Sequence, residues 1–211
     1  MKLPLPGTNA VEPFSILIYA ASTATGLVAT QFAKLSGLQV IATCSPHNFP
    51  YLRSLGADAV FDYASDTCPE DIKAFTQNRL RYTLDCTSTG TETCAFAMSD
   101  LEEGIYGVIN PADEDLLQAV NPRVRGPVET LAYDAPGDTY MWEGKEVTPQ
   151  KDELDFATEF AGITEELIAA KKLRPLRSVV NKTGSGLGGA LAGLDELRNG
   201  MVSACKLVYT I

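Results

Sequence analysis

Short apolar runs alternate with segments of helical spacing along the first half of the chain. The runs that predict strands are residues 15–20, 38–43, 59–62, 80–86 and 104–109. Between them, apolar residues recur three and four positions apart, which predicts helices at 27–35, 46–55, 68–78 and 91–101. Strands joined by short helical connections lie parallel in one sheet, with helices on both faces. The expected fold class is therefore α/β, with a doubly wound parallel sheet.

The alternation ends after residue 109. Residues 110–151 contain five prolines and one strand-like run, at 128–133, which predicts an edge strand followed by a long surface loop. Helical spacing returns at 152–172. Six apolar residues of this helix form a stripe that we expect to face the core: Leu154, Phe156, Phe160, Ile163, Leu167 and Ile168. With the edge strand included, the sheet should have about six strands.

The turn after the first strand, residues 20–26, consists of small residues and ends in Gly26. Small residues there let the backbone N–H groups at the start of a helix reach a pyrophosphate. Ala20 stands where this pattern has its first glycine, and an alanine at positive φ costs about 1 kcal/mol. The turn should therefore close another way or bind a dinucleotide less tightly. An ordinary buried turn between strand and helix is an equal alternative.

A literal G-x-G-x-x-G stands near the C-terminus, at residues 184–189. A strand-like run at 176–181 precedes it, and a helix is expected at 190–198. Only 22 residues follow Gly189, too few for the strands and the acidic residue that a dinucleotide-binding unit requires. We therefore expect a glycine-rich turn within a small C-terminal strand–helix–strand appendage.

Composition narrows the function classes. The formal net charge of −10, without clusters of Lys and Arg, argues against nucleic acid as a partner. Five cysteines without a C-x-x-C pair, beside a single histidine, predict no metal site and indicate reduced thiols in the cytoplasm. The apolar runs are too short to span a membrane, and prolines interrupt the N-terminal stretch that could resemble a signal peptide.

Five segments together carry a family resemblance through their order and spacing. They are residues 17–26 (LIYAASTATG), 41–48 (IATCSPHN), 55–63 (LGADAVFDY), 84–86 (LDC) and 194–209, which ends in KLVY. In this combination the chain resembles the medium-chain dehydrogenase/reductase superfamily, and within it the zinc-free, trans-acting enoyl reductases that work beside fungal polyketide synthases. The resemblance implies a Rossmann-type sheet that binds NADPH. It also implies reduction of the enoyl double bond of a small-molecule polyketide that is tethered to a carrier protein.

The resemblance also bears on domain organisation. Members of this family begin with a GroES-like domain, whereas this chain starts just before the first Rossmann strand. Residues 1–175 would then be the dinucleotide-binding domain, and 176–211 the segment that completes the GroES-like domain. The chain is expected to be a piece of a longer protein or a truncated form with another use. Apolar surface left uncovered in this way favours self-association into a homo-oligomer.

The resemblance places the cofactor along the turns that follow the strands. On the pyrophosphate side it places Ala21, Ser22, Thr23, Ala24 and Thr25, although Ser22 or Thr23 could equally be a helix N-cap. The end of the second strand, 43–48, carries no acid to bind a ribose 2′-hydroxyl, which favours NADPH over NADH. The expected donors to the 2′-phosphate are Ser45, His47 and Asn48, with Tyr63 stacked nearby. An N-cap role for Ser45 and a solvated His47 are the alternatives.

The ends of the fourth and fifth strands should line the ribose and the nicotinamide. The resemblance places Cys86, Thr87 and Asn110 there, and the alternatives are a structural Cys86 and a turn-forming Asn110. No residue is identified as the proton donor, and the lone histidine belongs to a different strand end from Cys86. Two functions stay open: an NADPH-dependent enoyl reductase, or a reductase-like protein that serves as a cyclase, an isomerase or a non-catalytic partner of a megasynthase.

Overall fold

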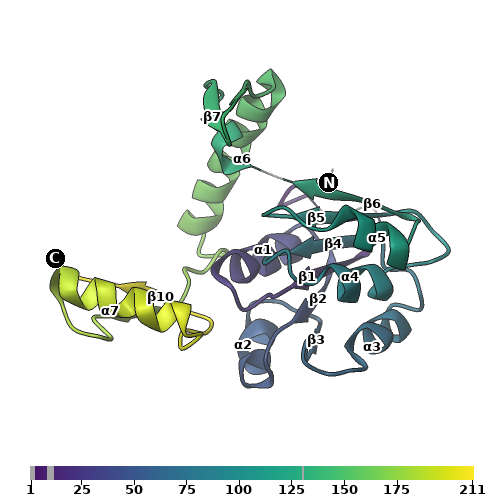
Figure 1. Cartoon of the computed structure of the whole chain (residues 1–211), viewed down its shortest axis with the longest axis horizontal. Helices are drawn as coiled ribbons and strands as arrows, with labels where there is room; N and C mark the ends of the chain where they lie inside the picture. Colours follow the sequence, from purple (N-terminus) through teal and green to yellow (C-terminus); the bar gives the residue numbers. More distant parts are fainter. Residues whose placement is uncertain (1–2, 9–11, 130) are drawn as a thin grey trace.

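A computed structural model describes residues 3–8, 12–129 and 131–211, and its centre is a parallel sheet of six strands (Figure 1). The strands are β1 (Ser15–Tyr19), β2 (Gln39–Thr43), β3 (Ala59–Phe61), β4 (Tyr82–Asp85), β5 (Gly104–Val108) and β6 (Val124–Glu129). Their order across the sheet is β3-β2-β1-β4-β5-β6, and every neighbouring pair is parallel. This confirms the predicted doubly wound sheet.

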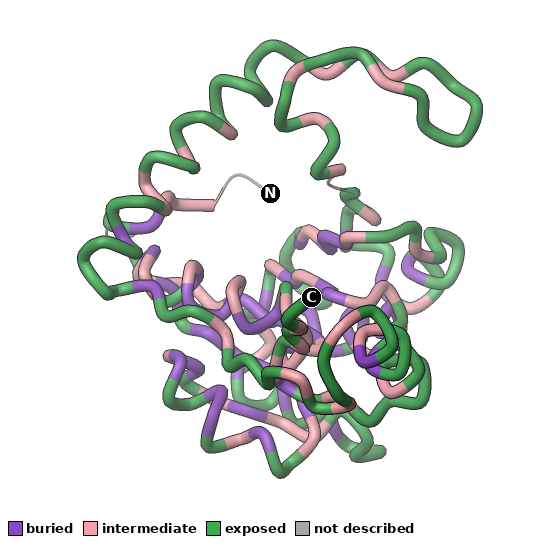
Figure 2. The backbone as a smooth tube through the Cα atoms, turned by 90° about the vertical axis from the view of Figure 1, so that its left-hand side faces the viewer, coloured by how far each residue is buried: buried purple, intermediate pink, exposed green. Residues whose placement is uncertain are grey.

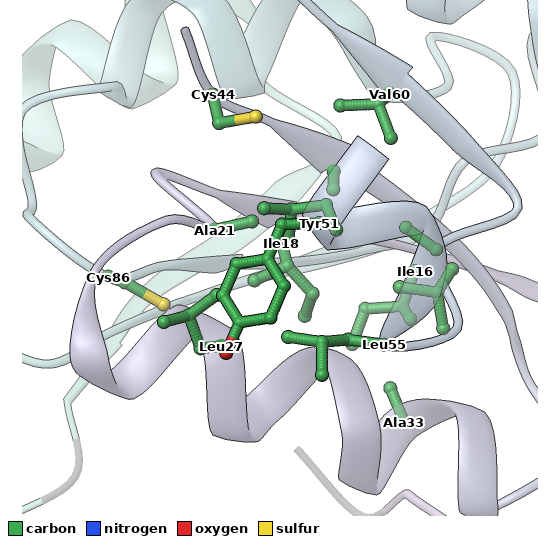
Figure 3. Packing of buried hydrophobic residues seen from close by; sticks show 14 of the residues in the cluster. Ile16, Ile18, Ala21, Leu27, Ala33, Cys44, Tyr51, Leu55, Val60 and Cys86 are labelled. Carbon is green, nitrogen blue, oxygen red and sulfur yellow. The ribbon is translucent and has the colours of Figure 1, made fainter. Parts of the chain in front are cut away.

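Helices cover both faces of the sheet because successive side chains of a strand point to opposite sides. Ile16 and Ile18 of β1 pack with α1 (Ala24–Leu35) and α2 (Phe49–Ser54) in one buried cluster (Figure 3). The short 3-10 helix η1 (Pro46–Asn48) leads into α2. Leu17 and Tyr19 pack on the other face with α3 (Cys68–Phe75), α4 (Thr91–Ala97) and α5 (Glu114–Val120). None of the described helices is both long and apolar enough to cross a membrane.

The sixth strand was expected at 128–133 but lies four residues earlier. β6 ends at Glu129, Thr130 lies outside the described residues, and Ala132–Asp134 forms the 3-10 helix η2. The expectation was wrong because Gly126 and Pro127 interrupt the apolar pattern in the middle of the strand. At an edge such residues are tolerated, and a register shift opposite Ile105 and Gly107 accommodates them.

Residues 110–151, where only an edge strand and a following loop were expected, also contain a helix and a hairpin. Helix α5 begins after Asp113, whose carboxylate accepts a hydrogen bond from the backbone N–H of Leu116 at 2.9 Å. An antiparallel hairpin joins β7 (Tyr140–Trp142) to β8 (Lys145–Val147) through Glu143 and Gly144, both at positive φ. The N-cap aspartate followed by two acidic residues is a sequence signal that could have revealed α5.

Helix α6 (Lys151–Ala169) corresponds to the helix expected at 152–172, but most of its apolar stripe does not face a core. Only Leu167 of the stripe is buried, while Leu154, Phe156 and Ile168 are exposed. The helix touches α1 through the rings of Phe160 and Phe32, whose centroids lie 4.9 Å apart. An apolar cavity of about 640 Å³ lies between residues 3–6, α1, the sheet and α6, so Phe156 and Phe160 of the stripe line a cavity and not a packed core.

Residues 131–169, which we call the arm, comprise η2, the hairpin and α6. Figure 1 shows α6 and the hairpin projecting away from the sheet, and Figure 2 shows that most of the arm is exposed. The polypeptide then returns to the body at Arg174. There the buried Gln31 side chain of α1 donates to the carbonyl oxygen of Arg174 at 3.2 Å and accepts from its N–H at 2.9 Å.

The C-terminal residues form the expected strand–helix–strand appendage. It consists of β9 (Ser178–Val180), α7 (Gly186–Arg198) and β10 (Lys206–Val208), with the two strands paired in parallel. The G-x-G-x-x-G segment lies in this appendage and not at the crevice of the central sheet. A Cβ on Gly189 would lie 2.1 Å from the carbonyl oxygen of Gly184, so these glycines serve close backbone packing.

Candidate cofactor site at the carboxyl edge of the sheet

All twelve residues expected to bind the cofactor follow the carboxyl ends of β1 to β5. Because these strands are parallel, the turns that follow them meet at one edge of the sheet. From β1 the strand order runs to one side through β2 and β3, and to the other side through β4, β5 and β6. Open α/β sheets bind ligands in the crevice where the order changes side in this way. The structure thus places the expected turns on one edge, around the turn that follows β1.

The turn after β1 closes with Ala20 at a φ of +55°, so it does not close in another way as the sequence had suggested. Three hydrogen bonds hold the strained residue. Its N–H donates to Thr43 Oγ1 at 3.0 Å, and its carbonyl oxygen accepts from Thr23 Oγ1 at 2.9 Å and from the N–H of Thr23 at 3.0 Å. Together they offset the cost of about 1 kcal/mol that alanine adds at positive φ.

Thr23 is the N-cap of α1, as one of the two expectations had it. Its hydroxyl accepts from the N–H of Gly26 at 3.1 Å. The N–H of Ala21 is also engaged, because it donates to the carbonyl oxygen of Thr43 at 2.8 Å. The N–H groups of Ser22, Ala24 and Thr25 have no acceptor among the described residues. Three unpaired donors at a helix N-terminus suit an anion.

The turn after β2 presents a mixed set of side chains. Ser45 is the N-cap residue of η1 by position, but its hydroxyl makes no cap hydrogen bond. His47 Nε2 and Asn48 Nδ2 both contact Ser203 Oγ of the C-terminal segment, at 3.3 Å and 2.8 Å. Tyr63, which follows β3, is half-exposed. The structure therefore leaves Ser45 and Tyr63 open to a ligand, while His47 and Asn48 already have a polar partner.

A buried carboxylate that the sequence did not single out organises the turn after β4. Asp85 is fully buried. Its Oδ1 accepts from the N–H and hydroxyl of Thr87, at 2.8 Å and 2.9 Å, and from the N–H of Ser88 at 2.8 Å. Its Oδ2 accepts from the N–H of Gly90 at 2.7 Å and from the hydroxyl of Tyr106 at 2.9 Å. Asp85 thus fixes residues 87–90 at the edge of the sheet.

The other expected residues at this end have mostly structural roles. Cys86 is buried, and Thr87 directs both its N–H and its hydroxyl to Asp85. The Ser88 hydroxyl donates to the carbonyl oxygen of Asn110 at 2.7 Å and accepts from its N–H at 3.1 Å. This bridge joins the ends of β4 and β5. The Asn110 side chain itself is exposed, so it is free to approach a ligand.

Burial determines the chemistry of the thiols. Burial, with a smaller effect of Asp85, raises the pKa of Cys86 to about 12. Cys86 therefore stays protonated at neutral pH and is not a nucleophile. Burial also raises the pKa of Cys44 and of Cys68 to about 11, and that of Cys94 well above its usual value. All five cysteines are free thiols.

These shifts predict a pH dependence of stability. In the unfolded chain a thiol has a pKa of about 8.5. A thiol whose pKa is higher in the folded state contributes stability, and this contribution is fully present below pH 8.5. That contribution is lost as the pH rises toward about 11, the pKa of Cys44 and Cys68 in the folded protein. We expect the free energy of unfolding, measured by urea titration, to fall between these pH values.

At pH 8 a thiol reagent should label Cys205 first, because the other four thiols are buried. Rapid labelling of all five thiols in the folded protein would contradict the assignment.

Part of the chain matches a known protein family. Residues 24–100 match a family model described as zinc-binding dehydrogenase. Despite that description, the described residues contain no group of three or more His, Cys, Asp or Glu side chains that could hold a metal ion. The matched region runs from α1 to the end of α4 and contains most of the candidate site.

Relatives and solved structures resemble nearly the whole chain. A dual trans-enoyl reductase/FAD-dependent monooxygenase, tazHJ of Aspergillus terreus, is 41% identical over 95% of this chain and 28% of its own length. A trans-enoyl reductase of Gibberella fujikuroi is 34% identical over 99% of this chain. The chain spans 59% of the length of that second relative.

The fold is shared with solved structures. The crystal structure of a putative NADPH:quinone reductase from Bacillus thuringiensis superposes with a TM-score of 0.73 at 15% identity, and the match covers 95% of this chain and 57% of that one. A match at this identity shows the shared fold. The sheet order, the turn after β1 and the similarity to trans-enoyl reductases over the whole chain agree with one another. The chain thus resembles the fungal trans-enoyl reductases over nearly its whole length, and its residues 24–100 match the zinc-binding dehydrogenase family.

Proposed function

We propose that this chain is the nucleotide-binding part of an NADPH-dependent enoyl reductase that acts on a carrier-tethered polyketide. One observation carries the proposal: three N–H groups at the start of α1, without an acceptor in the described part of the chain, lie at the same sheet edge as the acid-free turn after β2. The first feature suits a pyrophosphate, and the second admits a 2′-phosphate. The relatives named trans-enoyl reductase support the reaction class.

The residues present fit the dinucleotide. The N–H groups of Ser22, Ala24 and Thr25 would donate to the pyrophosphate, and Gly26 permits the close approach of α1 to the turn. A Cβ on Gly26 would lie 2.5 Å from the Cα of Ala21. Ser45 would donate to the 2′-phosphate, and Tyr63 would lie beside it. Such donors to a charged phosphate contribute roughly 1.5–3 kcal/mol each.

The chemistry divides between cofactor and protein. NADPH, when bound, supplies the hydride for the enoyl double bond. This chain's residues bind and orient the cofactor, and Asp85 fixes the turn expected beside the nicotinamide through its bonds to Thr87, Ser88 and Gly90. Cys86 is unsuited to donate the proton, because burial holds its pKa near 12 and it lies inside the core.

Cofactor preference tests the proposal directly. Replacing Ser45 with aspartate removes a donor and adds a negative charge beside the 2′-phosphate, so NADPH binding should weaken by about tenfold or more. NADH binding should change little. The matched control is Ser185→Asp, because Ser185 is also an N-cap serine without a cap hydrogen bond, but it lies in the C-terminal appendage. Calorimetric titration with both cofactors would measure the effect, and equal affinity of the unaltered protein for NADPH and NADH would refute the assignment.

Hydride transfer requires a separate assay. Because the chain spans 59% of the Gibberella relative, the remainder of that relative is added as a second polypeptide. Oxidation of NADPH is followed with an enoyl thioester carried on a carrier protein. We expect turnover that depends on this second polypeptide. Tight NADPH binding without turnover under any of these conditions would leave the chain a cofactor-binding protein and contradict the reductase proposal.

A further inference from the structure

The arm carries a groove that shares no residue with the cofactor edge. The groove has a volume of about 730 Å³ and lies between the segment around η2 and the first half of α6. Its apolar wall includes Leu131, Phe156, Ala157 and Phe160. Four carboxylates also line it, from Glu129, Asp134, Asp152 and Glu153. The groove therefore combines an apolar floor with negative charge.

An aromatic cluster extends this surface onto the hairpin. The ring of Tyr133 lies 5.3 Å from that of Trp142 and 5.8 Å from that of Tyr140. The hydroxyl of Tyr140 donates to Asp134 at 2.7 Å, which connects the hairpin to the groove. Tyr133, Met141 and Phe156 are each more than half exposed. Contiguous exposed aromatic and apolar residues of this kind mark interaction surfaces.

Charge decides between possible occupants. The arm contains ten Asp and Glu residues against two Lys, a net charge of −8, whereas the whole chain carries −10. Nucleic acid and anionic lipid surfaces are repelled by such a field, and so is the same groove of a second copy. A cationic partner is attracted. An apolar floor beside carboxylates matches a helix with one apolar and one basic face.

We propose that the arm groove binds a basic amphipathic helix of a protein partner. The apolar residues of that helix, spaced three and four positions apart, pack against Leu131, Phe156 and Phe160 of the groove. Its Lys or Arg residues lie beside Glu129 and Asp152. Both carboxylates are exposed, so they attract the partner without a buried ion pair.

The sole tryptophan of the chain makes the test direct. Trp142 packs against Tyr133, so a helix bound in the groove changes its fluorescence. The probe is a synthetic amphipathic peptide of Leu and Lys, about four helical turns long, compared with a peptide of the same pattern in which Glu replaces Lys. We expect the Lys peptide to shift the Trp142 emission at saturation and the Glu peptide to leave it unchanged. Raising the salt concentration from about 0.05 M to about 0.5 M should weaken the binding by about tenfold.

Two sets of variants locate the site. The double variant Glu129→Gln, Asp152→Asn should weaken binding of the Lys peptide by about fivefold. The matched control, Glu92→Gln with Asp115→Asn, removes the same charge from exposed first-turn positions of α4 and α5 on the body and should leave binding unchanged. Phe156→Ala should weaken binding, whereas Leu187→Ala, also at an exposed position but on α7, should not. Circular dichroism verifies that each variant is folded.

Three outcomes would overturn the proposal. The first is equal binding of the Lys and Glu peptides, which would show unspecific apolar contact. The second is a peptide affinity that responds to the body variant as strongly as to the arm variant. The third is self-association, measured by analytical ultracentrifugation, that the arm variants abolish, because it would assign the groove to a second copy of the chain. Failure of NADPH to bind would leave this result untouched, so the two proposals are tested separately.

Discussion

Replacing Gly26 with alanine should lower the free energy of unfolding by about 3 kcal/mol. A Cβ at this position would lie 2.5 Å from the Cα of Ala21 and 2.7 Å from the carbonyl oxygen of Ala20. Both are backbone atoms of the turn after β1, so the clash cannot be relieved by turning a side chain. The N-terminus of α1 must move, which also displaces the N–H groups expected to bind the pyrophosphate. Urea titration measures the first effect and NADPH titration the second.

Gly162→Ala is the matched control for this change. Gly162 lies inside α6, and a Cβ added there meets nothing within 4 Å. Alanine is the better helix former, so the control should stabilise the protein by about 0.5–1 kcal/mol. Opposite signs for the two substitutions are therefore expected. A Gly26→Ala protein as stable as the parent would show that the turn is not closely packed.

Replacing Asp85 with alanine should cost roughly 4 kcal/mol of stability. The substitution leaves the N–H groups of Thr87, Ser88 and Gly90 without their acceptor, and the buried hydroxyl of Tyr106 keeps only Thr91 Oγ1 as a partner. Unsatisfied buried donors cost about 1–3 kcal/mol each, and relaxation of the turn recovers part of that sum. Urea titration measures the loss, and hydrogen exchange at Ser88 and Gly90 should accelerate because the turn is released.

The control for Asp85 is Asp66→Ala, at an exposed position in the loop before α3. This change should leave the unfolding curve where it is, because no buried donor depends on Asp66. Asparagine at position 85 is a second informative variant. The side-chain oxygen of asparagine can replace one oxygen of Asp85 as an acceptor, but its amide nitrogen would face N–H or O–H donors. Asp85→Asn should therefore retain only part of the stability that Asp85→Ala loses. A loss no larger for Asp85→Ala than for Asp66→Ala would remove the structural role assigned to this carboxylate.

The predictability of the fold follows from what each element contacts. Strands β1 to β5 could be predicted because their residues form near-continuous apolar runs, as expected of strands covered on both faces. β6 lies at the edge, where Gly126 and Pro127 are tolerated, so its pattern is broken and the boundary was wrong. The stripe on α6 illustrates another limit. Amphipathic spacing indicates that a helix has an apolar face, but it carries no information about what covers that face.

The candidate site also has a part that could be predicted from the sequence and a part that could not. The positions of the candidate residues could be predicted because parallel strands bring their carboxyl ends to one edge. The partners of Asp85 could not, because Tyr106 is 21 residues away and only the folded sheet brings them together. The contact between Asn48 and Ser203 spans 155 residues. Hydrogen bonds between such distant positions leave no local pattern, although a lone aspartate at the end of an apolar strand is a signal worth following.

The attachment of the C-terminal appendage has a mechanical consequence. Its entry is fastened at Arg174, whose backbone hydrogen-bonds to the side chain of Gln31 of α1, and the segment between α7 and β10 is fastened at Ser203 beside Asn48. The segment between them is thus a closed loop with both ends fixed to the body. Opening such a loop releases less chain entropy than freeing a tail that has one loose end. β9 and α7 can therefore melt and reform as a separate cooperative unit while Arg174 and Ser203 keep their places on the body.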